Sequence, residues 1–224
     1  MLLTVSAIIP AWIALWIVYR VDRHPEYKYR VFILYLLGAV CVAPAGWIEK
    51  YLLDLYAHTP DPQTGFIAIL VTAFFVAGMT EETLKGIVFY RAVLNRQFFD
   101  EPFDGIIFAV AIGLGFATIE NILYVQSDGL SSAFVRAFTA IPAHALFGII
   151  MGSYFSEHRF DRKPLWPAFV VPAILHGMYD TFALAQGYLA NLLLVLYLMW
   201  LVRLAFIKTQ KLMNTTRREM GVPT

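Results

Sequence analysis

Long apolar stretches, separated by short polar segments, make up most of this chain. They cover residues 2–19, 31–48, 66–90, 103–126, 131–155, 165–186 and 188–207. Each stretch is close to the roughly 20 residues that an α-helix needs to cross the hydrocarbon core of a bilayer. The pattern predicts an all-α fold, a polytopic transmembrane helical bundle of about seven spans.

The amino-acid composition agrees with this prediction. Hydrophobic residues make up 59% of the 224 positions, whereas soluble domains contain roughly 45–50%. The formal net charge is only +1, so charge gives no argument for a nucleic-acid partner. We expect a single membrane domain over residues 1–224, with the lipid bilayer as its surroundings.

Lysine and arginine are concentrated in every second connection. Loops 20–30, 91–102 and 156–164 and the C-terminal tail carry most of them, whereas the alternate connections are nearly empty, with Lys50 and Arg136 at their edges. Short cytoplasmic loops are enriched in these two residue types. The pattern therefore predicts that the N-terminus lies outside and the C-terminus in the cytoplasm.

Charged residues interrupt the third apolar stretch at Glu81, Glu82 and Lys85. An ionisable group at the centre of a bilayer costs roughly 2.5–3.5 kcal/mol even on the translocon scale, so such groups are candidates for function. On a helix, Lys85 lies four residues after Glu81 and three after Glu82, so it can pair with either one. One negative charge is then left over, which suits a group that exchanges protons with water.

Further polar residues interrupt the next three stretches. They are Glu120 and Asn121, then His144, then His176 and Asp180. His176 and Asp180 are four residues apart and therefore share one helical face. Each residue alone could serve only to join helices through hydrogen bonds, but together with the Glu pair they exceed what packing needs. We interpret them as one site, with Lys85 and Asn121 in structural pairing roles.

Proline and glycine positions bear on how these residues meet. Counting along each stretch places the two histidines near the middle of the bilayer, the Glu pair toward the cytoplasmic half and Glu120 toward the outer half. Kinks at Pro142 and Pro172 would have to bring these groups level. Gly148 and Gly152 have the GxxxG spacing that lets helices approach closely, which is a structural role.

The order of the polar residues carries a family resemblance. Glu81-Glu82-x-x-Lys85, Phe116-x-x-x-Glu120 with Asn121, His144, and His176-x-x-x-Asp180 follow one another in consecutive stretches. This set resembles the PrsW family of intramembrane proteases, which shares a superfamily with the type II CAAX prenyl endopeptidases. The resemblance covers about residues 66–186, the motif-bearing core of the chain.

The resemblance implies an intramembrane endopeptidase in a prokaryotic cell membrane. Its substrate would be a membrane-anchored protein such as a single-span anti-sigma factor, cut first in a stress-signalling cascade. By the same resemblance Glu81 is the general base that activates water, and Glu82 pairs with Lys85. His176 would stabilise an oxyanion or transfer a proton. Where CAAX endopeptidases have HxxxN this chain has Asp180, which we expect to orient His176.

Two mechanisms stay open on the sequence. Where CAAX endopeptidases have FxxxH this chain has Glu120, so Glu81 and Glu120 could share a proton across a water without a cofactor. Alternatively, His144 and His176, with one or both of these carboxylates, could supply the ligands of a catalytic zinc. No HExxH motif is present. We favour the glutamate mechanism.

Two other classes of function fit the same residues. Buried Glu, His and Lys side chains also form proton relays in proton-coupled transporters, but the chain has no sign of inverted repeats and its polar set is confined to the third to sixth stretches. A non-catalytic membrane scaffold would not need the Glu pair, which is intact. Proteolysis is therefore the favoured function.

Overall fold

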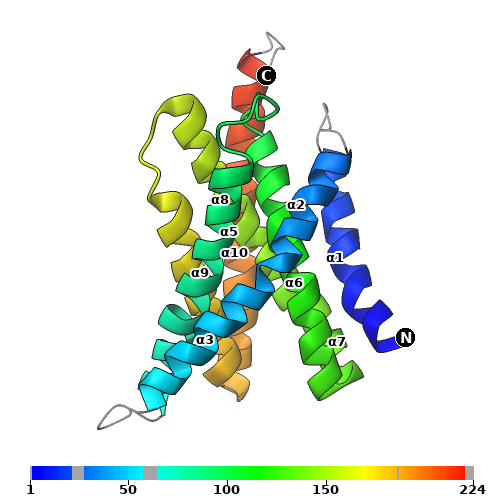
Figure 1. Ribbon diagram of the computed structural model, residues 1–224, viewed down its shortest axis with the longest axis vertical. Helices are drawn as coiled ribbons and strands as arrows, with labels where there is room; N and C mark the ends of the chain where they lie inside the picture. The colour runs from blue at the N-terminus through cyan, green and yellow to red at the C-terminus, as the bar shows by residue number, and fades with distance from the viewer. Residues whose placement is uncertain (1, 22–27, 58–64, 186, 220–224) are drawn as a thin grey trace.

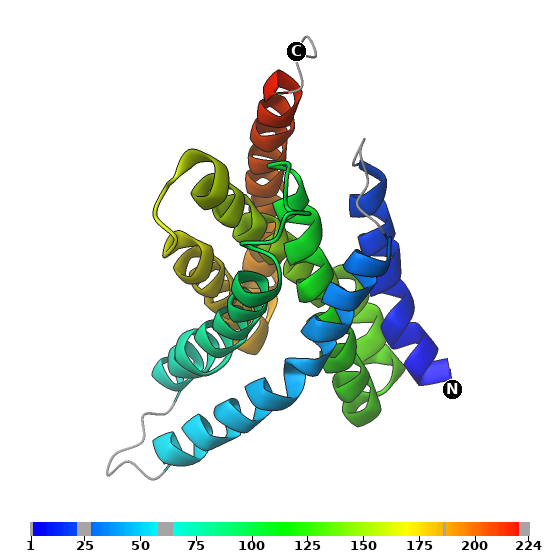
Figure 2. The ribbon, with the colours of Figure 1, turned by 45° about the horizontal axis from the view of Figure 1, so that its top comes forward.

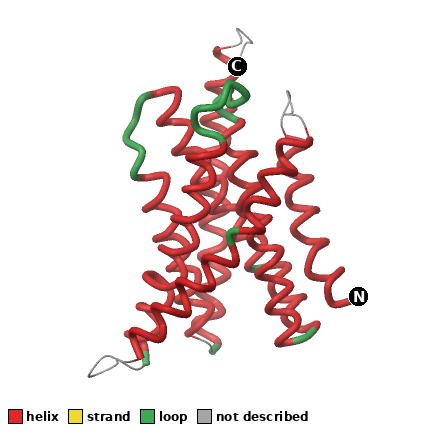
Figure 3. Tube along the Cα trace, viewed as in Figure 1, coloured by secondary structure: helices red, strands yellow, loops and turns green. Residues whose placement is uncertain are grey.

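The computed structural model describes residues 2–21, 28–57, 65–185 and 187–219. Within these ranges every regular element is helical, and no strand occurs (Figure 3). The elements are α1 (Leu2–Val21), α2 (Lys28–Val40), α3 (Val42–Ala57), α4 (Phe66–Leu70), the π-helix η1 (Val71–Gly78), α5 (Met79–Ala92), α6 (Asp104–Asp128), α7 (Leu130–Phe138), α8 (Ala140–Asp161), α9 (Pro167–Ala185) and α10 (Tyr188–Glu219). The prediction of an all-α fold is confirmed.

In the part of the chain that the structure describes, six helical segments are long and apolar enough to cross a membrane, judged by length and composition. They are Lys28–Ala57, Phe66–Ala92, Asp104–Asp128, Leu130–Asp161, Pro167–Ala185 and Tyr188–Thr216. The first helix adds a shorter apolar segment, Thr4–Arg20. The polytopic bundle is thus confirmed, with six long spans and one shorter helix in place of the seven predicted spans.

Successive segments run in alternating directions, so the two chain termini lie at opposite ends of the bundle (Figure 1). The C-terminal ends of α1, α5, α8 and α10, where most lysine and arginine is found, lie together at one of these ends, which we call the basic end. This arrangement is what the predicted topology requires. That the basic end faces the cytoplasm stays a prediction.

Two spans are divided in the structure, each four residues before a proline. Helix α2 ends at Val40, and Pro44 lies in the first turn of α3. Helix α7 ends at Phe138, and Pro142 lies in the first turn of α8. A proline ring clashes with the carbonyl four residues earlier, whereas the first turn of a helix needs no N–H from it. The kink expected at Pro142 is therefore a break between two helices, at Thr139.

Helix α3 extends to Ala57, whereas the second apolar stretch is predicted to end at residue 48. That prediction is wrong for this stretch, because positions 47–57 contain no glycine or proline to stop a helix. Of α3 only Ala45 is buried, while Trp47 and Tyr51 are exposed. Helix α3 contacts η1 and α5 and is directed away from α7 (Figure 2). It forms a thin wall on one side of the bundle.

Small residues let α6 pack closely against α8 and α2. A Cβ on Gly148 would lie 2.9 Å from Val110 Cα, and a Cβ on Gly152 would collide with the backbone of Gly105. A Cβ on Gly38 of α2 would likewise collide with the backbone of α6. These contacts agree with the structural role predicted for Gly148 and Gly152. We call this contact of α6 with α8 and α2 the glycine seam.

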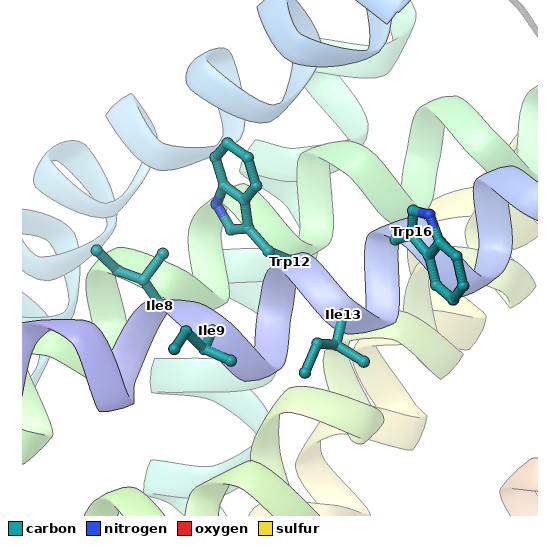
Figure 4. A pocket seen from close by; sticks show the side chains of 5 residues that line it. All are labelled: Ile8, Ile9, Trp12, Ile13 and Trp16. Atoms are coloured by element: carbon teal, nitrogen blue, oxygen red, sulfur yellow. The ribbon is translucent and has the colours of Figure 1, made fainter.

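The outward face of α1 is apolar. Five side chains line a groove of about 480 Å³ on this helix: Ile8, Ile9, Trp12, Ile13 and Trp16 (Figure 4). Trp12 points away from Ile9 and Ile13 in that view, and its indole N–H donates a hydrogen bond to Tyr35 Oη on α2 at 3.1 Å. An exposed apolar surface of this kind suits contact with lipid acyl chains.

Candidate active site

Glu81, Glu82 and Lys85 lie in the first two turns of α5, and all three are buried. Lys85 Nζ lies 3.0 Å from Glu81 Oε2 and 2.7 Å from Glu82 Oε1. The ammonium therefore pairs with both carboxylates rather than with one. The same nitrogen lies 4.1 Å from the centre of the Phe116 ring on α6, where the face of an aromatic ring attracts a cation.

The π-helix η1 ends at Gly78, directly before this group. A Cβ on Gly78 would lie 2.7 Å from the carbonyl oxygen of Ala173 on α9, so glycine permits the close approach of the two helices. Pro172, which the sequence analysis expected to kink this span, lies inside α9 beside the approach. π-Helical turns occur often at functional sites. Here the approach places His176, one turn further along α9, next to the Glu pair.

His176 has carboxylates on both sides of its ring. Nδ1 is 2.9 Å from Glu82 Oε1 and 3.8 Å from Glu81 Oε2, and Nε2 is 3.4 Å from Asp180 Oδ2. Asp180 thus contacts His176, as the spacing of the two residues on one helix predicts, and its orienting role stays a prediction. Because ionised carboxylates only accept hydrogen bonds, a ring that donates from both nitrogens fits this place.

His144 connects two parts of the site. Its Nδ1 lies 3.2 Å from Lys85 Nζ, and its Nε2 lies 2.9 Å from Glu120 Oε2. An ammonium can only donate a hydrogen bond, so Nδ1 is the acceptor. The ring proton of a neutral His144 is then on Nε2, which donates it to Glu120. Hydrogen-bond geometry thus assigns the tautomer of His144.

The His144 ring connects groups that residue counting placed at different depths in the bilayer. Lys85 is on one side of His144 and Glu120 on the other, so a side chain makes the connection that the sequence analysis expected from kinks. Among the described residues, four have metal-ligating atoms within 4.8 Å of one another: Glu81, Glu82, His144 and His176. Glu120 lies outside this group. The ligand set expected from the sequence thus has Glu82 in place of Glu120.

A cavity of about 510 Å³ adjoins these groups. Its polar lining includes Glu81, Glu120, His144, His176 and Asp180. Glu82 and Lys85, whose exposed fractions are 1% and 2%, do not line it. The Glu pair therefore has one member that faces the cavity, Glu81, and one member that lies behind it, Glu82.

The cavity extends from the Glu pair toward the end of the bundle opposite the basic end. Its lining runs from Phe116 to Tyr124 on α6 and from His176 to Leu184 on α9. Both helices run away from the basic end (Figure 1). The cavity therefore lies on the side of Glu81 that is away from the basic end.

Two charged residues that the sequence analysis left out of the site line this cavity, Glu49 on α3 and Arg136 on α7. Arg136 Nη2 forms an ion pair with Glu120 Oε2 at 3.2 Å, without a directed hydrogen bond. Both residues stand at the edge of an apolar stretch. That position is the one signal for them in the sequence, and it is equally typical of a connection between spans.

Asn121 joins three helices from a completely buried position on α6. Its Nδ2 donates to the carbonyl oxygen of Ala7 on α1, and its Oδ1 accepts a hydrogen bond from Arg136 Nε on α7, both at 2.9 Å. Asn121 thus connects α1, α6 and α7, and its structural pairing role stays a prediction.

Comparison with known proteins decides the family. The family described as PrsW family intramembrane metalloprotease matches residues 26–206. The chain belongs to the PrsW family. It is thus a multi-pass membrane protein of a family of intramembrane proteases, and its PrsW relatives below come from bacteria. No solved structure matches the chain significantly.

Several curated relatives bear the name Protease PrsW. The relative from Geobacillus kaustophilus is 36% identical over 185 residues, which cover 80% of this chain and 78% of the relative. The relative from Oceanobacillus iheyensis is 33% identical over 210 residues, which cover 91% and 93%. The relative from Bacillus subtilis is 39% identical over 151 residues, which cover 65% and 66%. The similarity to PrsW proteases therefore extends over most of the chain.

The four side chains of the possible ligand group are of chemical types that bind zinc. Imidazole nitrogens and carboxylate oxygens are typical zinc ligands. Each histidine also has a carboxylate on its other nitrogen, as metal-ligating histidines usually have. The pairs are His144 with Glu120 and His176 with Asp180. However, Lys85 Nζ contacts three of the four donors, so an ion held by all four would have to replace this ammonium.

Proposed function

We propose that this protein hydrolyses a peptide bond of a membrane-anchored protein, with Glu81 as the general base. One observation supports this most. Of the Glu pair, Glu81 alone lines the cavity, beside both histidines, while Lys85 holds its carboxylate from behind. A general base must reach the water whose proton it takes. Glu82, which contacts Lys85 and His176, would keep the buried side of the site in place.

In this proposal the proton moves between Glu81 and His176. Water in the cavity gives a proton to Glu81, and the resulting hydroxide attacks the carbonyl carbon of the scissile bond. When the C–N bond breaks, the leaving amine takes a proton from His176, whose Nδ1 lies 3.8 Å from Glu81 Oε2. The proton on Glu81 then returns to His176, which restores both groups.

Glu120 and Asp180 act in this proposal as positioning residues. Glu120 is engaged by His144 and Arg136, so we assign it to orienting His144 rather than to sharing a proton with Glu81. Asp180 holds the outer nitrogen of His176. Fixed carboxylates of this kind keep an imidazole in one orientation, and at His176, which has carboxylates on both sides, they also favour the protonated form.

A metal-dependent form of the same reaction is the second candidate, favoured by the ligand group and by the description of the family. Zinc would polarise the scissile carbonyl and activate the water. Its ligands would be Glu81, Glu82, His144 and His176. We favour the glutamate form, because Lys85 already supplies a positive charge among these donors.

For the substrate we propose a single-span anti-sigma factor, which the family resemblance implies. The cavity extends toward the end opposite the basic end. Under the predicted topology this end faces the outside, so the cut would fall in the outer half of the membrane. Such a cut would release the outer part of the substrate and suits the first step of a signalling cascade.

The deciding experiment is cleavage of a single-span test substrate by purified protein in liposomes. The wild type is expected to cut it. Glu81→Gln should lower the rate by about 10²–10⁴-fold, the usual contribution of a general base, while the protein stays folded. Asp100→Asn changes an exposed loop carboxylate and serves as the control, with an unchanged rate.

A strong zinc chelator separates the two chemical forms. Cutting that survives the chelator supports the glutamate form. Cutting that is lost and then restored by added zinc supports the metal-dependent form. A wild-type protein that cuts no member of a panel of single-span substrates but conducts protons across the liposome membrane would contradict proteolysis in favour of transport.

A further inference from the structure

Glu49 is a carboxylate at the cavity that has no partner among the described residues. It lies on α3 and is half-buried, and its Oε1 is buried without a hydrogen bond. A carboxylate withdrawn from water is costly unless a donor or a cation compensates it. The cavity wall thus contains an acceptor whose partner is not supplied by the rest of the described chain.

The other carboxylates of the cavity are already matched. Glu81 pairs with Lys85, Glu120 contacts His144 and Arg136, and Asp180 contacts His176. The N–O distances of these ion pairs are 2.9–3.4 Å. Glu49 therefore differs from them in that it is free to receive a positive group that enters the cavity.

The surroundings of Glu49 leave room for such a group. Val42, Ala45, Gly46 and Leu53 line the cavity from the same stripe of α3. A Cβ on Gly46 would meet no atom within 4 Å, so the space beside Glu49 is open. The opposite walls carry small residues too, among them Ala183 on α9. A peptide segment with one long side chain can be accommodated there.

We propose that Glu49 is a specificity-determining residue that binds a lysine or arginine side chain of the substrate close to the scissile bond. This inference rests on the proposed function, because it assigns a substrate contact at the same cavity. A basic side chain has an aliphatic stem that packs on the apolar lining and a charged head that meets the carboxylate. An apolar side chain at that position would leave Glu49 without a partner, and an acidic one would be repelled.

The test measures binding and cleavage separately. Synthetic single-span peptides of leucine and alanine carry one lysine, moved position by position, or its uncharged analogue norleucine. Binding is measured in detergent micelles with the Glu81→Gln variant, so that no peptide is cut. At one position lysine should bind about tenfold more tightly than norleucine, as a hydrogen bond to a charged group predicts.

Variants at Glu49 decide the assignment. Glu49→Gln should abolish the preference for lysine, and Glu49→Lys should reverse it in favour of a peptide with glutamate at that position. Asp54→Asn removes the same charge from the same helix away from the cavity lining and should leave the preference intact. A preference for lysine that survives in Glu49→Gln, or no preference at any position, overturns the proposal.

Cleavage by protein with Glu81 intact keeps the two proposals apart. Glu49→Gln should raise KM about tenfold for the lysine peptide, leave kcat unchanged, and change neither constant for the norleucine peptide. Binding that depends on Glu49 in a protein that cuts nothing would contradict the proposed function alone. Efficient cleavage without any dependence on Glu49 would contradict the substrate contact alone.

Discussion

Two regions of this bundle are packed in opposite ways. In the glycine seam, a Cβ on Gly148 would lie 2.9 Å from Val110 Cα, whereas a Cβ on Gly46 of α3 would meet no atom within 4 Å. Most of α6 is buried along its length, but of α3 only Ala45 is. Close backbone contact fixes helices against one another, while the thin wall leaves volume. The site takes its fixed geometry from the first region and its accessible space from the second.

The polar residues of the site also belong either to the glycine seam or to the thin wall, or lie between the two. Glu120 and His144 belong to α6 and α8, two of the three helices of the seam, and they contact each other at 2.9 Å. Glu49 stands on the thin wall without a partner among the described residues. Glu81 lies between these regions, with Lys85 behind it and the cavity in front. Changes in the buried part should therefore affect folding, and changes at the wall should affect substrate choice.

Lys85→Met should have the largest effect on stability, because it removes the ammonium that Glu81 and Glu82 share. Loss of one partner from a buried ion pair costs about 3–5 kcal/mol, and here two carboxylates lose their cation. Methionine keeps an apolar chain of similar length, so packing against Phe116 is largely retained. We expect a clearly lower Tm in detergent and no cleavage of the test substrate.

Lys50→Met provides the control for this change. Lys50 is exposed on α3, and exposed charges contribute little to stability. The Tm of the Lys50→Met variant should stay close to that of the wild type. If Lys85→Met melted at the same temperature as Lys50→Met, the shared pairing of Lys85 would be wrong.

Gly152→Ala tests the seam directly. The added methyl group would collide with the backbone of Gly105, which cannot move without separating α6 from α8. Overpacking of this kind costs about 1–3 kcal/mol. Gly46→Ala makes the same change at the thin wall, where it should leave stability unchanged or raise it by about 0.5–1 kcal/mol, since alanine favours a helix over glycine. Equal unfolding free energies for the two variants would contradict the difference in packing between the glycine seam and the thin wall.

Glu120→Gln should have a smaller effect on the fold than Lys85→Met and a moderate effect on the reaction. Glutamine can still accept the hydrogen bond from His144, but it no longer pairs electrostatically with Arg136. Loss of such a supporting carboxylate lowers activity by about 10–100-fold. The fall should appear in kcat with KM unchanged. Asp128→Asn, at the exposed end of the same helix, is the control, and a matching fall there would argue against a role in orienting His144.

Contacts within one helix were open to prediction from the sequence. Lys85 follows Glu81 and Glu82 at helical spacing, and Asp180 follows His176 in the same way, so pairing within each set depends only on the geometry of one α-helix. The break at Thr139 was less well predicted. A kink at Pro142 itself is the simplest expectation, but the clash of a proline ring falls on the carbonyl four residues earlier, so the break lies before the proline.

By itself, the sequence determined the all-α membrane fold, the ordered motif of its family and the pairs that lie within single helices. These depend on the length of apolar stretches and on the fixed rise and turn of a helix. Only the tertiary structure decided that His144 lies between Lys85 and Glu120, that Glu82 rather than Glu120 joins the possible ligand group, and that Glu49 reaches the cavity. Such contacts depend on how far each helix is rotated and displaced against its neighbours, which close packing of glycines and side chains along many residues sets together.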